Sequence, residues 1–413
     1  MPYHSTDSFR SEHIDHHQSL NIIDSLLQKY LLSGLNRWDS HYFTTVAVDG
    51  YKSDNLIAFF PLYPLMLRYS SQLVMVLTFS TLHSTSVILI TAAIMNSILF
   101  VISTLSLYQL TNVIFKNKHF AEKTVDWYIY NPASIFFSAN YSESLFTCLT
   151  FTALWLLGSN QIIIAAFTLG LSSLTRSNAV ISVGFLVHKQ FSALYITWNR
   201  SYNSTRSSNH GPINTLEITK RITITLLTVA LGIVPFVAYQ WYTYYEFCQT
   251  NQSINIGRSD WCETSWLPYA AVQQKYWNQG FLRYYQFKQI PNFVLAAPIV
   301  TIMIASSMHY LFMHKHLWLT LGLTCSKVQK TRNSVFNNEA CFVYVVHALA
   351  LTLFGLLFIH VQVITRLICA SSPLLYWVVA SPVNKKWTRI NKLFFRSYFV
   401  VGTFMFSNFL PWT

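Results

Sequence analysis

Charged residues are scarce in this chain. Only 10% of its 413 residues are Asp, Glu, Lys or Arg, whereas 52% are hydrophobic and 16% are aromatic. A soluble domain carries about 25% charged residues. Apolar runs long enough to cross a hydrocarbon layer of about 30 Å recur along most of the length, with no soluble domain beside them. The shortage of charge therefore argues against an ordinary soluble protein and predicts one integral membrane domain.

Several motifs of soluble enzymes are also missing. The chain has no GxxxxGK[ST] and no GxGxxG pattern, which argues against a Walker-type NTPase and a Rossmann nucleotide site. It has no DxD pair for a metal-bound nucleotide sugar, so any sugar donor is expected to be a lipid-linked phosphate. Its six cysteines form no CxxC pair, which argues against a zinc ribbon. The stretch "HIDHH" (13–17) lies in a polar tail without partner ligands, so no metal site is predicted.

What the chain has instead is a series of apolar segments. Their lengths and the residues that interrupt them predict an all-α, polytopic bundle of about ten membrane-spanning helices. The predicted spans are 87–115, 121–138, 142–158, 162–175, 179–198, 222–246, 292–313, 339–360, 363–380 and 397–411.

The basic residues gather in four of the connecting loops. Residues 116–123, 199–221, 314–332 and 384–396 hold 16 of the 28 Lys and Arg residues. With these spans all four loops fall on one side, which the positive-inside rule assigns to the cytoplasm. The net charge of +13 is therefore explained without a nucleic-acid partner, because the cations lie between apolar spans and not on an amphipathic face.

Polar clusters fall on the opposite face of this predicted topology. Irregular polar backbone is tolerated near a membrane only where it lines a cavity or meets water. The segment 59–79 is interpreted as an interfacial or re-entrant helix, since Pro61 and Pro64 interrupt regular hydrogen bonding and Arg68 lies inside it. The alternative is an eleventh span, which would put the stretch 36–51 on the cytoplasmic face. The chain then divides into a polar tail (1–35), a first non-cytoplasmic loop (36–86), helices (87–246), a large non-cytoplasmic loop (247–291) and C-terminal helices (292–413).

Asp39 is the best candidate for a general base. It lies in "NRWDSHYF" (36–43) between Trp38 and Ser40, where a carboxylate can take the proton of an acceptor hydroxyl. Taken alone, the residue is better explained as the cap of a short helix, a common role for Asp. Asp49 and Asp54 are weaker rivals in the same loop.

Further candidates lie in the other polar clusters at the same face. A cation near the membrane boundary suggests a partner such as a phosphate, although some will be interfacial anchors. Glu143 either binds sugar hydroxyls or favours the N-terminal dipole of the following helix. The candidate substrate-binding residues are Arg37, Trp38, His41, Glu143, Arg176, Asn178, Arg283, Lys288, His360, Gln362 and Arg366.

Long strings in the sequence resemble a known family. "LNRWDSHYF", "IAFFPLYPL", "NPASIFFSANYSESLF", "YWNQGFLRYYQFKQIPNFVLAAPI" and "NFLPWT" are similar to the GPI mannosyltransferase 2 family, multispanning endoplasmic reticulum enzymes of the GT-C superfamily. The resemblance covers nearly everything from residue 35 onward. It departs at the start, because members of the family begin with a transmembrane helix that is missing from this sequence.

The resemblance implies a function and its substrates. The family adds the second mannose, in α1,6 linkage, to the GPI-anchor precursor glycolipid on the luminal side of the endoplasmic reticulum membrane. The donor is dolichyl-phosphate mannose, no cofactor is needed, and a small accessory membrane subunit is a possible partner. The family's important Trp-Asp pair maps onto Trp38 and Asp39. The surroundings of Cys248 and Cys262 also look like the family's, which favours a disulfide between them.

Three alternatives stay open at this point. A sibling mannosyltransferase with the same donor would share both the Asp and the topology. A transporter or lipid scramblase would also explain cations near the membrane, but it predicts internal repeats and broken helices at the bilayer midplane. An inactive homologue is the third, because of the missing first helix.

Overall fold

The computed structural model describes residues 22–77, 84–206, 215–249, 259–323, 334–381, 385–410 and 412. This part of the chain contains helices and no β-strand. The α-helices are α1 (Ile22–Leu27), α2 (Ser40–Asp49), α3 (Leu62–Leu77), α4 (Ser84–Phe115), α5 (Lys118–Ile129), α6 (Glu143–Gly158), α7 (Ile162–Ser173), α8 (Ala179–Arg206), α9 (Thr215–Cys248), α10 (Pro268–Trp277), α11 (Ile290–Met313), α12 (Lys315–Thr320), α13 (Phe342–Phe358), α14 (Ile364–Ser371), α15 (Pro373–Ala380) and α16 (Lys385–Ser407).

Short helical turns join these helices. One is a π-helical turn, η1 (Gln28–Leu32), and the others are 3-10 turns. The 3-10 turns are η2 (Asp54–Ala58), η3 (Ser134–Phe137), η5 (Asp260–Glu263), η6 (Phe287–Gln289), η7 (Val335–Asn337), η8 (Glu339–Cys341) and η9 (Val361–Val363).

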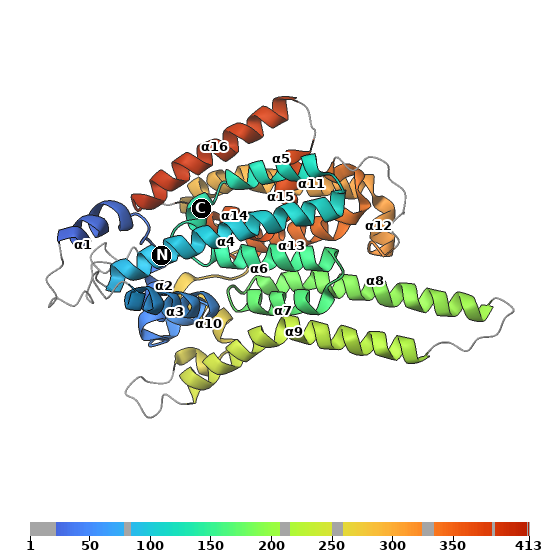
Figure 1. Cartoon of the computed structure of the whole chain (residues 1–413), viewed down its shortest axis with the longest axis horizontal. Helices are drawn as coiled ribbons and strands as arrows, with labels where there is room; N and C mark the ends of the chain where they lie inside the picture. Colours follow the sequence, from blue (N-terminus) through green and yellow to red (C-terminus); the bar gives the residue numbers. More distant parts are fainter. Residues whose placement is uncertain are drawn as a thin grey trace.

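The long helices form a bundle whose axes run along the length of the molecule (Figure 1). Helix α6 packs against α4 and α7, and α9 packs against α7 and α8. At Gly170 of α7, an added Cβ would collide with the backbone oxygen of Leu231 in α9, so the absence of a side chain permits this close approach. The fold class predicted from composition, an all-α membrane bundle, is confirmed.

The predicted count of about ten spans is not confirmed. Within the described residues, five helices are long and apolar enough to cross a membrane, and a bent pair makes a sixth if it is one span. Helices α6 and α7 are apolar but shorter. The five are Ser84–Phe115, Ala179–Asn199, Thr215–Cys248, Phe287–Met313 and Glu339–Phe358.

Three of the predicted spans differ most from the helices of the structure. The segment 121–138 is not one helix, because α5 ends at Ile129, before Pro132, and η3 follows; a residue that precedes proline is disfavoured in helical conformation. The segment 363–380 is broken into α14 and α15, which bend by 81° at Ser372 before Pro373. The last predicted span, 397–411, belongs to the longer α16, which begins in the basic stretch at Lys385 and ends at Ser407.

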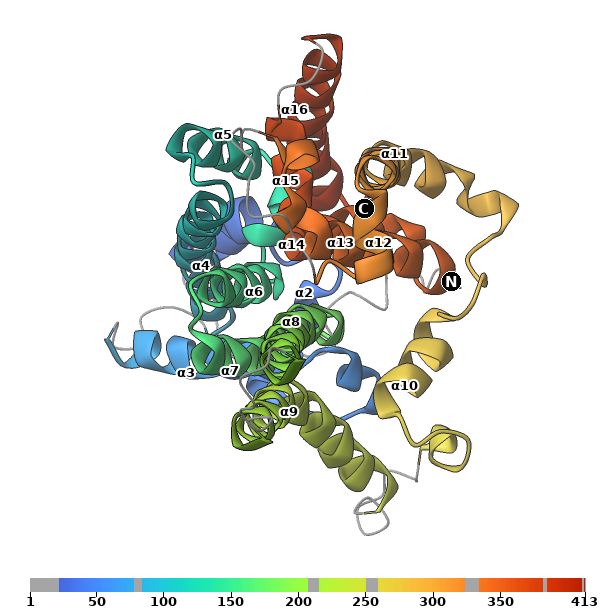
Figure 2. The same ribbon diagram turned by 90° about the vertical axis from the view of Figure 1, so that its right-hand side faces the viewer.

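Helix α3 lies across one end of the bundle. Viewed along the bundle axis, α3 extends sideways, whereas α4, α6 and α8 are seen nearly end-on (Figure 2). One of its faces exposes the apolar residues Leu65, Tyr69, Leu73 and Val76. An exposed apolar stripe on a helix in this orientation suits the surface of a bilayer.

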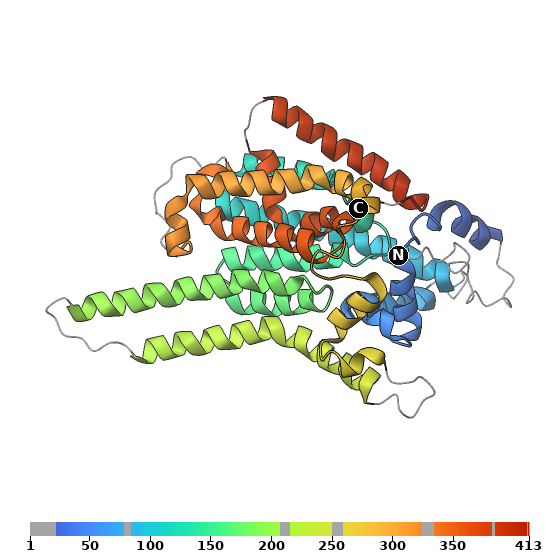
Figure 3. The same cartoon turned by 180° about the vertical axis from the view of Figure 1, so that it is seen from behind.

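The two ends of the bundle differ in what they carry. The junction of α4 and α5 lies at one end together with α12, the end of α8, the start of α9, the end of α15 and the start of α16, whereas α1, α2, α3 and α10 lie at the other (Figures 1 and 3). The first of these ends carries the described parts of the four basic loops. We call the end with α2 and α10 the α2 end and the end with α12 the basic end.

Candidate active site

Asp39 lies at the α2 end, directly before helix α2. Asp39 is the N-cap residue of α2, as the cap interpretation expects, but its carboxylate makes no hydrogen bond to the amides of the helix. The side chain instead accepts a hydrogen bond from Arg366 of α14, with Oδ2 at 3.3 Å from Nη1. It is 33% exposed, so its carboxylate is both paired and open to an incoming ligand.

The backbone on both sides of Asp39 is held by Tyr141. The buried Tyr141 hydroxyl accepts a hydrogen bond from the Asp39 amide at 3.0 Å and donates one to the Arg37 carbonyl at 3.2 Å. Between them Trp38 has a positive φ of 55°, which costs a bulky residue about 1–3 kcal/mol. Contacts from other parts of the chain therefore determine where the carboxylate lies.

Glu143 is the centre of a buried ion cluster. It is the first residue of α6 and its side chain is fully buried. Its Oε1 accepts a hydrogen bond from Nη1 of Arg176 and lies 3.2 Å from Nε of Arg366. The positive end of the α6 dipole also favours a carboxylate at this position.

Arg366 joins Glu143 to Asp39. Its guanidinium is close to both carboxylates, and its side chain is only 14% exposed. The ring centroids of Phe136 and Tyr141 lie 5.0 and 5.6 Å from its Cζ atom. Asp39, Glu143, Arg176 and Arg366 thus form a set of two carboxylates and two guanidiniums, which we call the charge cluster. Balanced charge is what permits such groups to be buried together.

Asn178 supports the charge cluster from the loop between α7 and α8. Its Oδ1 accepts a hydrogen bond from Nε of Arg176 at 3.4 Å, and its Nδ2 donates one to Ser371 Oγ at 2.9 Å. Since Ser371 ends α14 and Arg366 lies in its first turn, this contact links the two arginine-bearing segments.

Arg37 and Trp38 contact the C-terminal part of the chain. Arg37 donates a hydrogen bond from Nε to the Ser407 carbonyl at 3.2 Å, and its Cζ lies 4.1 Å from the centroid of Phe409. Trp38 packs on the same ring at 5.9 Å and is 39% exposed. His41 is exposed on α2. Arg37 therefore anchors the loop, while Trp38 and His41 present surface beside Asp39.

The remaining predicted residues lie along the segment that leads from α10 to α11 and around the α13–α14 turn. Arg283 and Lys288 are exposed, and the guanidinium of Arg283 lies 3.2 Å from the side-chain amide of Gln274. His360 stacks on Tyr284 at 4.5 Å, and Gln362 accepts a hydrogen bond from the Tyr284 hydroxyl at 3.1 Å. Burial lowers the pKa of His360, so this ring is neutral at physiological pH.

The rival carboxylates have other partners. Asp49 forms an ion pair with Lys52. Asp54 accepts hydrogen bonds from Trp261 and Lys275, each at 3.2 Å, and from Tyr276. These contacts attach the large loop to η2, close to the disulfide that joins Cys248 and Cys262. The predicted disulfide is thus confirmed, and Asp54 has a structural role.

The sequence did not indicate the polar residues that position the site. Asn140 donates to the Ser40 carbonyl at 3.1 Å and to Thr44 Oγ1 at 2.9 Å, and it accepts from the Tyr63 hydroxyl at 2.9 Å. Asn140 is 1% exposed, so its side chain is buried among these partners. The polar run "SANYSES" (138–144) between apolar helices was the available signal. The tail stretch 13–17 lies outside the described residues.

The family model and the similar proteins that match this chain agree on one family. A family model described as Mannosyltransferase (PIG-V) matches residues 1–413. GPI alpha-1,6-mannosyltransferase 2 of Cricetulus griseus is 31% identical across 100% of this chain and 94% of its own length. GPI mannosyltransferase 2 of Drosophila melanogaster is 31% identical with the same coverage, and that of Yarrowia lipolytica is 30% identical across 84% of this chain and 79% of its own length.

No solved structure matches the chain. The family match spans its whole length, and the structure shows a membrane-type helical bundle with a charge cluster at one end. The chain therefore belongs to the PIG-V family of mannosyltransferases and is a membrane glycosyltransferase.

Proposed function

We propose that this protein transfers the second mannose, in α1,6 linkage, from dolichyl-phosphate mannose to the GPI-anchor precursor. The observation that carries the proposal is the partly exposed Asp39 carboxylate bonded to Arg366, in a chain whose relatives are named GPI alpha-1,6-mannosyltransferase 2. The chemistry takes place at the α2 end, which faces the lumen of the endoplasmic reticulum if the basic end follows the positive-inside rule.

The proposed reaction is a single inverting displacement. Asp39 takes the proton of the 6-hydroxyl of the first mannose as that oxygen attacks the anomeric carbon of the donor. The bond from this carbon to the phosphate oxygen breaks, and dolichyl phosphate leaves with the electron pair. Inversion of a β-linked donor gives the α-linked product without a covalent enzyme intermediate.

The charge cluster suits the movement of charge in this reaction. Asp39 loses its negative charge when it takes the proton, while the departing phosphate gains one. Arg366, which contacts Asp39 and Glu143, then has one anionic partner fewer and can stabilise the phosphate. Arg176 is the second candidate for this contact, and the exposed Arg283 is a candidate for binding donor phosphate from the loop segment.

The second oxygen of Glu143 suits a hydrogen bond to a sugar hydroxyl. Oε2 is buried and accepts no hydrogen bond from the described residues. Buried polar atoms are usually satisfied, so an unused acceptor beside a site marks a position for a ligand donor. The proposed mechanism uses protein cations for the phosphate and needs no cofactor; a small accessory membrane subunit remains part of the proposal.

The test is complementation of cells that lack the second GPI mannosyltransferase. The chain, its Asp39→Asn variant and its Asp49→Asn variant are expressed at equal membrane levels, and surface GPI-anchored protein and accumulated precursor are measured. Asp49 is the matched control: it lies ten residues further along the chain, at the end of α2, and is paired only with exposed Lys52 among the described ion pairs. We expect rescue by the chain and by Asp49→Asn, and a one-mannose precursor with Asp39→Asn.

Three results would contradict parts of the proposal. Equal rescue by Asp39→Asn would remove Asp39 as the base. No rescue by any of the three, followed by mannose transfer to a different glycolipid in isolated membranes, would show a sibling mannosyltransferase. No transfer to any acceptor would favour a transporter or an inactive homologue.

A further inference from the structure

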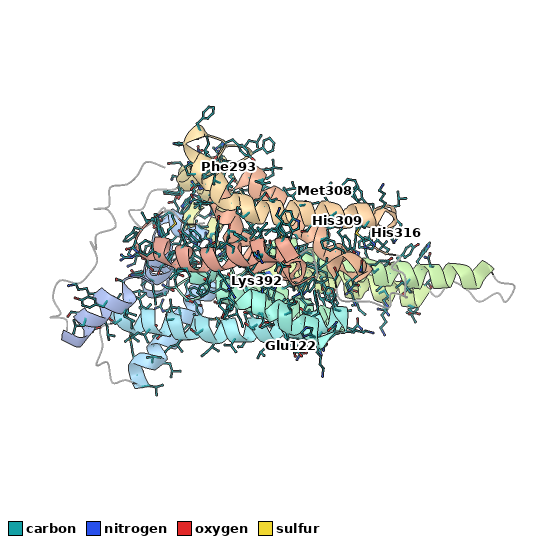
Figure 4. All side chains as sticks on the ribbon, turned by 90° about the horizontal axis from the view of Figure 1, so that it is seen from above. Glu122, Phe293, Met308, His309, His316 and Lys392 are labelled. Atoms are coloured by element: carbon teal, nitrogen blue, oxygen red, sulfur yellow. A yellow bond between two sulfur atoms is a disulfide. The ribbon has the colours of Figure 1, made fainter. Side chains whose placement is uncertain are left out.

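Two histidines and a glutamate meet at the basic end of the molecule. His314 and His316 lie where α11 passes into α12, and Glu339 begins η8. One ligand atom from each of the three lies within 4.8 Å of the other two. Figure 4 shows the labelled His316 at the end of α11 that is remote from Phe293, which lies near the start of the same helix. The cluster is thus at the opposite end of the bundle from α2 and Asp39.

We propose that His314, His316 and Glu339 bind a zinc ion. Two imidazoles and one carboxylate are a ligand set that zinc uses with a fourth position open to water. The proposal does not rest on the transferase reaction, which uses the other end of the bundle.

The distance between two of the ligands agrees with a shared metal. His316 Nε2 and Glu339 Oε1 are 3.3 Å apart. Two ligands bonded to zinc at about 2.0–2.2 Å in tetrahedral geometry lie about 3.3–3.5 Å from each other. Without a metal, the two atoms would need a proton on one of them, so that they form a hydrogen bond at this distance.

The hydrogen bond of His314 leaves one ring nitrogen for a metal. Its Nε2 lies 2.9 Å from the Phe336 carbonyl, which only accepts, so Nε2 carries the proton and Nδ1 keeps its lone pair. A histidine that ligates zinc typically donates its other N–H to a carbonyl or carboxylate in this way.

The protein holds these ligands in place before any metal binds. The Tyr310 hydroxyl donates to the carbonyls of Asn338 and Glu339 at 3.0 and 3.2 Å, which fixes η8 against α11. The Tyr310 ring also packs on His314 at 4.5 Å. His314 and Glu339 are buried, whereas the His316 side chain is 55% exposed, so an ion can enter from the His316 side. The ion would join the α11–α12 junction to the start of α13.

The test measures zinc in the full-length protein. The chain and its variants are purified in detergent through a tag without histidine, exposed to zinc chloride and freed of excess by gel filtration, and metal is measured by mass spectrometry. We expect about one zinc per chain and at least a fivefold loss in His316→Gln and Glu339→Gln. His119→Gln is the matched control, because His119 forms a two-residue pair with Glu122 at 3.7 Å on α5.

A second measurement separates binding from folding. Zinc chloride should raise the melting temperature of the wild-type chain and of His119→Gln, but not of His316→Gln. Because the His316 side chain is exposed, its substitution should leave the fold intact, so a lost shift reports lost zinc binding. Zinc retained by His316→Gln, or the same zinc-dependent shift in all variants, would show adventitious binding only. A wild-type chain that takes up no zinc would also overturn the proposal.

Discussion

Glu143 is the residue on which the charge cluster depends. It is fully buried and contacts two arginines, Arg176 and Arg366. Removing one member of a buried ion pair typically destabilises a protein by about 3–5 kcal/mol, because it leaves an uncompensated charge. At Glu143 two guanidiniums would lose their shared partner, so the charge of this residue matters more than its shape.

We predict that Glu143→Gln lowers the stability of the protein by about 3 kcal/mol or more. Thermal unfolding in detergent, read by tryptophan fluorescence, measures the change. Glu122→Gln is the control, since Glu122 is 63% exposed and paired with His119, and it should stay within about 0.5 kcal/mol of the unmodified chain. A Glu143→Gln variant as stable as this control would show that the two arginines do not need the carboxylate.

Proline and charge explain the elements that differ from the sequence-based predictions. Helix α5 contains Lys118, Glu122, Lys123 and Asp126 and ends before Pro132, so it is shorter than the predicted span. At Ser372 the backbone is extended before Pro373, which separates α14 from α15. The break has a consequence for the site, because it makes α14 a short helix that carries Arg366 at the α2 end.

The contact of α10 with η2 depends on the ionised form of Asp54. Burial raises the pKa of Asp54, but hydrogen bonds from Tyr276, Lys275 and Trp261 outweigh it and hold the pKa below its usual value. A depressed pKa means that this carboxylate contributes stability above its unfolded-state pKa of about 3.9 and that the contribution is lost as the pH falls through the folded-state pKa.

We therefore predict that Asp54→Asn increases hydrogen exchange in η2 and α10 at pH 7. The difference from the unmodified chain should persist at about pH 4 and disappear only as the pH falls further, through the lowered folded-state pKa at which Asp54 itself becomes protonated. Hydrogen exchange corrected for the intrinsic rate at each pH measures this. Asp260→Asn is the control, because Asp260 is 91% exposed and lies 3.5 Å from the same Lys275. An equal effect of both variants, or one independent of pH, would contradict the role of Asp54.

The whole molecule separates its charge cluster from its basic residues. The charge cluster and the disulfide are at the α2 end, and the described parts of the loops rich in Lys and Arg are at the basic end. This polarity predicts that the two ends lie on opposite sides of the membrane.

Labelling of single cysteines in sealed microsomes tests that orientation. In a Cys325→Ser background, we expect His119→Cys to react with a membrane-impermeant maleimide and Lys52→Cys to react only after detergent is added. Both side chains are well exposed, at 90% and 67%. The cysteines Cys148, Cys341 and Cys369 are buried, so they contribute little background. The reverse pattern would place the charge cluster in the cytoplasm.

Composition alone determined the class of this protein, because a chain with 10% charged and 52% hydrophobic residues cannot bury its apolar surface without a membrane. The spacing of basic loops also determined which polar segments share one end. The sequence singled out Asp39, Glu143, Arg176 and Arg366 as separate candidates, but it did not pair them. It left open whether Asp39 caps a helix.

Only the tertiary structure decided how these residues act together. Asp39 and Arg366 are 327 positions apart in the sequence. The four side chains meet because α6 and α14 pack side by side and the loops before α2 and α8 lie at the same end. The hydrogen bonds of Tyr141 and Asn140 then fix the backbone around Asp39. Such contacts depend on distances between remote segments, whereas composition and local pattern report only the environment that each segment prefers.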